Sequence, residues 1–205
     1  MGRSTILTGI VLYGVFIAVS FGFLYGNLNS QHEDANTINK AGLQRMLSQR
    51  IALSVKNKQL ALNGHDSGFD SNILSTSIEI MHRNHMDLVH EEQPDDRHLS
   101  SALNGLYFAK SPSLYQRVID YTREAERVLR VDRAEDLNRL DLSLFQSPNI
   151  DNLLERLDEV VKQYEEEAQA KLQRTENLLN GLIFLHALAL LVLYGLCAHA
   201  LPKQD

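Results

Sequence analysis

The sequence predicts an all-α protein in which an antiparallel four-helix bundle is flanked by two membrane-spanning helices. Two segments without Asp, Glu, Lys or Arg, residues 4–31 and 177–202, exceed the roughly 20 apolar residues that a spanning helix needs. The segment between them holds 18 of the 20 Lys and Arg residues and 25 of the 26 Asp and Glu residues. Its apolar residues recur at helical spacing, and no useful stretch alternates as a strand would. The apolar content is therefore concentrated at the two ends, with an acidic helical domain between them.

The pattern divides the chain into five segments. The first apolar run is too long for a signal peptide and lacks a clear small-residue cleavage site, so we expect an uncleaved span. Arg3 and Lys203 favour cytoplasmic termini, which agrees with an even number of spans. We expect a cytoplasmic N-terminus (1–4), a first transmembrane helix (5–26), an extracytoplasmic four-helix domain (27–177), a second transmembrane helix (178–199) and a cytoplasmic tail (200–205).

Proline and glycine residues separate four helical patterns in the acidic domain. The first helix is expected over residues 30–62, continuous with the first span. The second is expected over residues 70–92, because apolar side chains recur alternately four and three residues apart. This stripe consists of Leu74, Ile78, Met81, His85 and Leu88.

The third and fourth helices each begin at a Ser-Pro pair. Ser111 is a plausible N-cap with Pro112 in the first turn, and Ser147 with Pro148 repeats the arrangement. The fourth helix is expected to continue into the second span. The predicted core positions are Leu114, Val118, Tyr121, Ala125, Val128 and Leu129 in the third helix, and Ile150, Leu153, Leu154, Leu157, Val160, Val161 and Tyr164 in the fourth.

The first helix presents two different faces. One stripe has mostly small side chains, with one arginine in its middle: Ile38, Ala41, Arg45, Ser48, Ala52 and Val55. Small residues allow another helix to approach closely. The larger apolar residues, Leu43, Met46, Leu47, Ile51 and Leu53, are expected to enter the bundle.

Arg45 on the small-residue stripe needs an anionic partner, because an unpaired buried guanidinium is costly. Two arrangements provide one. Two copies of the helix meeting at a two-fold axis would bring two Arg45 side chains together around a small anion. Alternatively, Arg45 bridges to a carboxylate of the fourth helix, where Glu165, Glu166 and Glu167 are available.

Residues 38–50 carry a motif formed by Asn39, Ala41, Gly42, Arg45, Met46, Ser48 and Arg50. This run resembles the N-terminal sensor motif of the type IV pili methyl-accepting chemotaxis transducer (PilJ-type) family, which includes the periplasmic domains of nitrate/nitrite sensor histidine kinases. Residues 153–165 also resemble that family. The resemblance implies a periplasmic four-helix sensor domain in a multi-pass protein of the bacterial inner membrane, and a homodimer formed through the first helix.

The resemblance also implies a ligand site for a small anion such as nitrate or nitrite. It assigns the anion to Arg45 across the dimer axis, near the backbone of Gly42, with Arg50, Ser48 and Asn39 as further motif residues. Family members continue from the second span into an output module, whereas this sequence ends at Asp205. The chain is therefore expected to act with a separate histidine kinase, cyclase or chemotaxis protein.

Two alternatives to an anion sensor remain open. The chain is either a ligand-independent interaction subunit of a membrane signalling complex, or the sensory fragment of a longer kinase, diguanylate cyclase or chemotaxis transducer. The first predicts co-purification with a membrane partner without small-molecule binding. The second predicts a coding sequence that continues beyond Asp205.

Several other classes of function are excluded or disfavoured. The acidic central segment argues against nucleic-acid binding. No phosphate loop, nucleophile elbow or pair of catalytic carboxylates occurs, so we expect no enzyme. His82 and His85 are three residues apart, but a mixture of core and solvated histidines is favoured over a metal or haem site, so no metal or cofactor is expected. Cys197 is the single cysteine, which excludes a disulfide within one chain.

Overall fold

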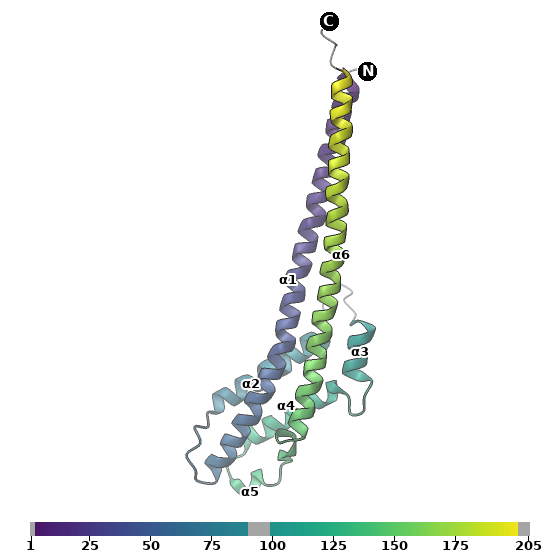
Figure 1. The fold of residues 1–205 in the computed structure, drawn as a ribbon. Helices are drawn as coiled ribbons and strands as arrows, with labels where there is room; N and C mark the ends of the chain where they lie inside the picture. The colour runs from purple at the N-terminus through teal and green to yellow at the C-terminus, as the bar shows by residue number, and fades with distance from the viewer. Residues whose placement is uncertain (1–2, 90–98, 201–205) are drawn as a thin grey trace. The chain divides into compact units, whose positions relative to one another are not determined.

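The computed structural model describes residues 3–89 and 99–200, and its regular structure is entirely helical (Figure 1). No strand occurs in these two ranges, which confirms the all-helical prediction. In chain order the helices are α1 (Arg3–Leu62), α2 (Ser71–Val89), α3 (Ser101–Phe108), α4 (Leu114–Arg130), α5 (Ala134–Leu137), the 3-10 helix η1 (Leu142–Phe145) and α6 (Asn149–Ala200).

The chain divides into two compact units. The central unit, Ala35–Glu166, contains the last part of α1, the first part of α6 and all the helices between them. The terminal unit combines residues 1–34 with residues 167–205, and so contains the first part of α1 and the last part of α6. The helix expected over residues 30–62 is therefore the last part of α1. The expected fourth helix is the first part of α6, which continues into the expected second span.

The central unit has one hydrophobic core. Burial of these side chains stabilises the unit by roughly 25 cal/mol for each Å² of apolar surface removed from water. The buried apolar residues come from every helix of the unit: Leu47, Ile51 and Val55 of α1, Leu74, Ile78 and Met81 of α2, Leu103 and Tyr107 of α3, Leu114, Val118, Tyr121, Ala125 and Val128 of α4, Leu137 of α5, Phe145 of η1, and Leu153, Leu157 and Val160 of α6.

α2 confirms the predicted apolar stripe, since all five of its residues are buried. The helix begins at Ser71, and the Asp70 carboxylate accepts hydrogen bonds from the amides of Asn72 at 2.8 Å and Ile73 at 3.4 Å. A carboxylate at this position satisfies amides that have no partner within the helix. Residues 90–92 of the predicted helix lie outside the described residues.

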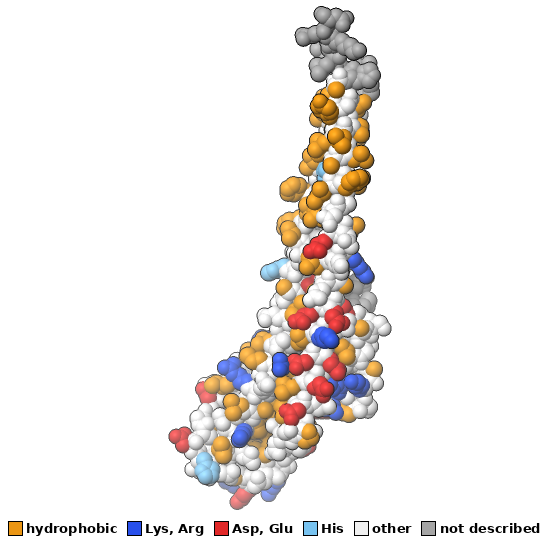
Figure 2. All heavy atoms as spheres, in the orientation of Figure 1, with side chains coloured by type: hydrophobic (Ala, Val, Ile, Leu, Met, Phe, Trp, Pro, Cys, Tyr) orange, Lys and Arg blue, Asp and Glu red, His pale blue; other side chains and the backbone are white. Residues whose placement is uncertain are grey.

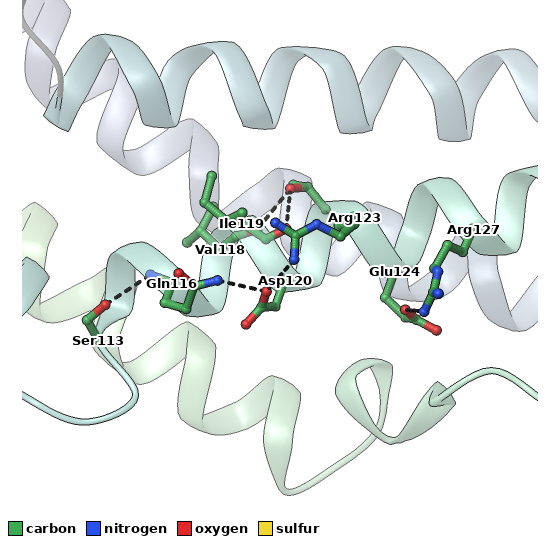
Figure 3. A network of polar contacts seen from close by, with 9 residues as sticks. Ser113, Gln116, Val118, Ile119, Asp120, Arg123, Glu124 and Arg127 are labelled. Carbon is green, nitrogen blue, oxygen red and sulfur yellow. Dashed lines mark hydrogen bonds and ion pairs between the residues drawn. The ribbon is translucent and has the colours of Figure 1, made fainter.

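α4 begins two residues later than the sequence predicts. Ser113 is the N-cap, and its hydroxyl accepts a hydrogen bond from the amide of Gln116 at 3.1 Å (Figure 3). Ser111 was expected in this role, but both Ser111 and Pro112 precede the helix. The buried line of α4 then follows the predicted positions from Leu114 to Val128.

α1 faces the core with Leu47 and Ile51, as predicted, and Leu43 packs against the core partly buried, but the other two large apolar residues lie outside it. Met46 and Leu53 were expected in the core, but they are 46% and 59% exposed. The core line instead uses small or polar residues of the stripe that was expected to be open to another helix, notably Ala41, Ser48 and Val55. Small side chains leave room there for Tyr121, whose hydroxyl reaches the backbone of Ser48.

The terminal unit has the opposite surface character. α1 and α6 are both long and apolar enough to cross a membrane, and few of the side chains in their apolar segments are buried. Figure 2 shows apolar side chains gathered over this part of the chain and charged side chains over the central unit. A core helix of a soluble protein would bury most of these side chains, so the two helices are compatible with an inner-membrane protein.

Candidate functional site

The motif residues of α1 lie on two sides of the helix. Asn39, Arg45 and Arg50 are exposed, Gly42 is half-buried, and Ser48 is fully buried. A Cβ atom added at Gly42 would meet no other atom within 4 Å, so the surface around this glycine is open in the single chain. The structure therefore groups four of the five predicted site residues at the surface and places Ser48 in the core.

The exposed side of α1 has a heptad pattern. Asn39, Met46, Leu53 and Leu60 are spaced seven residues apart, and the last three are 46%, 59% and 37% exposed. Gly42, Gln49 and Lys56 lie between them, so the positions alternate three and four residues apart. We call this line of seven residues the α1 seam. It matches the a and d spacing of a coiled coil.

Arg45 flanks the α1 seam and forms an ion pair with α6. Its Nε atom lies 3.1 Å from Oδ1 of Asp158, and the two side chains are 53% and 47% exposed. The expected bridge from Arg45 to the last helix is therefore present, but with Asp158 in place of Glu165, Glu166 or Glu167. The guanidinium keeps about half of its surface accessible, so an external anion can reach it.

Ser48 takes part in a buried contact between α1 and α4. The Tyr121 hydroxyl donates a hydrogen bond to the Ser48 carbonyl at 2.6 Å, and the Ser48 hydroxyl donates to the Arg45 carbonyl at 2.8 Å. Burial raises the pKa of Tyr121 well above its ordinary value. The phenol therefore stays protonated and acts as a donor, which fixes α4 against the turn of α1 that carries Arg45.

A second set of polar contacts joins α1 to α2 beside the motif. The Gln44 amide donates to the Met81 carbonyl at 3.0 Å, and Lys40 pairs with Asp87 at 3.0 Å. Gln44 is buried, so this hydrogen bond replaces the water that its Nε2 atom loses on folding, whereas its Oε1 atom has no partner in the described structure. These contacts position the face of α1 that carries Asn39 and Gly42.

The histidines of α2 occupy different environments. His85 is buried and its ring stacks on Tyr115 with a centroid distance of 5.3 Å, whereas His82 is exposed. Over residues 3–89 and 99–200, no group of three or more His, Cys, Asp or Glu side chains is placed to hold a metal ion. His90, Glu91 and His98 of the same region lie outside the described residues.

The terminal unit carries polar contacts between its two helices. His186 lies within hydrogen-bonding distance of the Ser20 hydroxyl, at 3.1 Å, and its ring packs on Phe16 with a centroid distance of 4.2 Å. Lys171 pairs with Asp34 at 2.6 Å beside an open groove with an empty volume of about 580 Å³. His186 of α6 thus faces α1, with a hydroxyl as its neighbour.

Sequence reasoning missed the α1 seam because it assigned Met46 and Leu53 to the core. The seven-residue spacing from Asn39 to Leu60 was the available signal, since a helix with a second apolar line has a second surface to cover. Which line faces the core depends on the helices packed against α1, and these come from distant parts of the chain.

Comparison with known proteins connects these residues to a family. Searches of curated proteins and of solved structures found no match. A family model described as "Type IV pili methyl-accepting chemotaxis transducer N-term" matches residues 27–129, which is half of the chain. The match includes the whole motif from Asn39 to Arg50, together with α2, α3 and nearly all of α4. This family is a non-catalytic signalling domain, and two apolar helices accompany it here. The chain therefore belongs to the family of type IV pili methyl-accepting chemotaxis transducer N-terminal sensor domains.

Proposed function

We propose that the protein is a membrane-anchored sensor whose central unit is an antiparallel four-helix bundle in the periplasm. α1, α2, α4 and α6 would be the four helices, since each contributes buried side chains to the single core. Residues 5–26 and 178–199 would cross the inner membrane, with residues 1–4 and 200–205 in the cytoplasm and residues 27–177 outside it. Arg3 and Lys203 support this orientation.

The observation that carries the proposal is the exposed α1 seam. A heptad line with Met46, Leu53 and Leu60 leaves apolar side chains in water unless a second helix covers them. A second copy of the same seam is the simplest cover, because a two-fold axis pairs like positions with like. The open surface at Gly42 supports close approach of that second helix. The protein would therefore form a parallel homodimer through α1.

This dimer would create the anion site. With Met46 and Leu53 at a positions, Arg45 is a g position and Arg50 is an e position of the following heptad. In a parallel coiled coil, these two positions face one another across the interface. Arg45 of each chain would therefore lie near Arg50 of the other. Two guanidinium groups repel each other, and a small oxyanion such as nitrate or nitrite between them would bind through fork-shaped donors.

Anion binding would be coupled to the bundle through Asp158. Arg45 pairs with this carboxylate of α6 in the unliganded chain, so an anion competes with Asp158 for the guanidinium. The ligand would stabilise the arrangement in which α1 is less strongly held to α6, because it binds that arrangement more tightly. Both helices continue beyond the central unit into the apolar segments, so the shift would reach the membrane spans.

Disulfide cross-linking tests the dimer. We expect Leu53→Cys, made with Cys197→Ser to remove the native thiol, to form a covalent dimer on mild oxidation in membranes. A residue near the axis brings its two copies within disulfide range. The matched control is Thr76→Cys, an exposed position on α2, which should stay monomeric. Equal cross-linking of the two variants would contradict the seam.

Calorimetry on the full chain in lipid nanodiscs tests the ligand. We expect saturable heat with nitrate or nitrite, and at least about tenfold weaker binding for Arg45→Ala, because charge-assisted hydrogen bonds are lost. Arg83→Ala is the control, since Arg83 is similarly exposed and pairs with Glu79 of its own helix. Equal affinities of wild type and Arg45→Ala would refute the role of Arg45.

The Arg45–Asp158 ion pair also favours a second candidate function. If the pair is permanent, Arg45 needs no ligand, and the chain is an interaction subunit for a separate kinase, cyclase or chemotaxis protein. This candidate predicts a stable complex with such a membrane partner and no anion binding that Arg45→Ala weakens. Calorimetry and co-purification from membranes together separate the two functions.

A further inference from the structure

A second pair of arginines lies inside the central unit, far along the chain from the α1 motif. Arg156 of α6 is only 6% exposed, and its Nη1 atom donates to the Pro112 carbonyl at 2.9 Å. Arg117 of α4 reaches α6, where its Nη1 atom donates to Oδ1 of Asn152 at 2.7 Å. Asn152 and Arg156 are four residues apart and so lie on one side of α6. The two guanidinium groups are thus neighbours between α4 and α6.

Each guanidinium retains a buried donor without an acceptor. Nη2 of Arg156 and Nε of Arg117 are shielded from solvent and have no hydrogen-bond partner in the described structure. A buried donor without an acceptor costs free energy, and more so when the group is charged. Neither arginine forms an ion pair with a described carboxylate. Glu159 is the acidic neighbour, and it pairs with Lys110 at 3.7 Å.

The surroundings add further positive potential. Arg117 is the fourth residue of α4, whose first turn contains no acidic residue. The amino end of a helix is positively polarised, so a cation there is unfavourable without a counter-charge. Burial and the Arg117 charge lower the pKa of Arg156, while Glu159 opposes this effect. Two neighbouring cations thus each keep a shielded donor without a partner, and neither forms an ion pair with a described carboxylate.

We infer that Arg117 and Arg156 form an anion site within a single chain, which takes a small oxyanion. The ligand must offer acceptors only, because both open groups are donors. It must be small, since the donors lie beneath the surface. Nitrate, sulfate and inorganic phosphate meet these requirements, and their oxygens suit guanidinium donors. This site needs no second copy, in contrast to the dimer site proposed at Arg45.

The test is calorimetry of the full chain in nanodiscs with nitrate, sulfate and phosphate in turn. We expect one anion per chain at this site, in addition to the one anion per dimer proposed at Arg45, and at least about tenfold weaker binding at the per-chain site for both Arg117→Gln and Arg156→Gln. Arg123→Gln is the matched control. It removes a charge from the same helix, where Arg123 is exposed and pairs with Asp120 at 3.0 Å (Figure 3).

A fallback comparison and one further variant keep the outcome decisive. Arg156 is buried, so if Arg156→Gln loses its helical circular dichroism, Arg117→Gln alone carries the comparison, because Arg117 is half-buried. Arg45→Ala should keep the one-per-chain site, which separates failure of this inference from failure of the dimer site. The absence of saturable heat with all three anions, or equal affinity in wild type and Arg117→Gln, would overturn the inference and leave water as the partner of these donors.

Discussion

The ion pair between Arg45 and Asp158 can be tested by a double-mutant cycle of Arg45→Ala and Asp158→Ala. The free energy of unfolding of wild type, both single variants and the double variant gives the coupling between the two side chains. If Arg45 is available to bind a ligand, the coupling energy between Arg45 and Asp158 must be small. If the pair is a structural link between α1 and α6, the coupling must be large.

The geometry predicts a small value. At a separation of 4 Å two unit charges attract by about 1 kcal/mol in water and by about 4 kcal/mol near a protein surface. The observed separation is 3.1 Å, but the side chains are 53% and 47% exposed, so solvent screens most of this attraction. Ordering the long Arg45 side chain offsets part of the remaining attraction. Exposed pairs of this kind contribute roughly 0.2–1 kcal/mol, and we expect a coupling in that range.

The assay is thermal unfolding of the four proteins in identical nanodiscs, followed by circular dichroism at low and high salt. We expect the coupling to fall further at high salt, because exposed charges are screened. Arg123→Ala with Asp120→Ala, an exposed pair within α4, provides a reference cycle. A coupling of about 3 kcal/mol or more, unaffected by salt, would refute the reasoning, since only a desolvated pair reaches that size.

Three further outcomes are expected. Tyr121→Phe should lower the free energy of unfolding by about 1–2 kcal/mol in thermal unfolding, because it removes one buried hydrogen bond at nearly constant volume. Ser113→Ala should cost about 1 kcal/mol and Ser111→Ala close to nothing, since only Ser113 caps α4. Hydrogen bonds from Ser143 lower the pKa of Asp141, so its contribution to stability is present above the ordinary carboxyl range and is lost as the pH falls through the lowered value. Asp141→Asn should therefore show a smaller loss of unfolding temperature between about pH 5 and pH 3 than wild type.

The helices were predictable wherever one apolar line dominates. In α2 the stripe from Leu74 to Leu88 is the only regular line, and all of it is buried. α4 likewise has one line, and its start was displaced only because two serines, Ser111 and Ser113, compete for the cap. Local chemistry identifies a capping residue type, but the backbone conformation of the preceding loop decides which serine caps the helix.

The orientation of α1 was predictable only in part, because Leu47 and Ile51 are buried as expected whereas Met46 and Leu53 belong to a second, exposed line. The core accepts Ala41 and Ser48 since bulky residues such as Tyr121 fill the space beside them, whereas Met46 and Leu53 remain outside. The proximity of Arg117 to Arg156 also could not be predicted from the sequence. Arg117 is 35 residues from Asn152, and only the packing of α4 on α6 brings the groups together.

Lys58 provides an internal reporter of the central unit. Its ammonium group is shielded from solvent, donates to the Leu129 carbonyl at the end of α4 at 2.6 Å, and lies 5.3 Å from the ring centre of Phe69. An amine-reactive reagent needs a deprotonated and accessible nitrogen. A brief treatment with the reagent should therefore modify exposed lysines such as Lys56 and leave Lys58 unmodified. The rate of Lys58 modification, read by mass spectrometry, then measures how often the end of α4 opens away from α1.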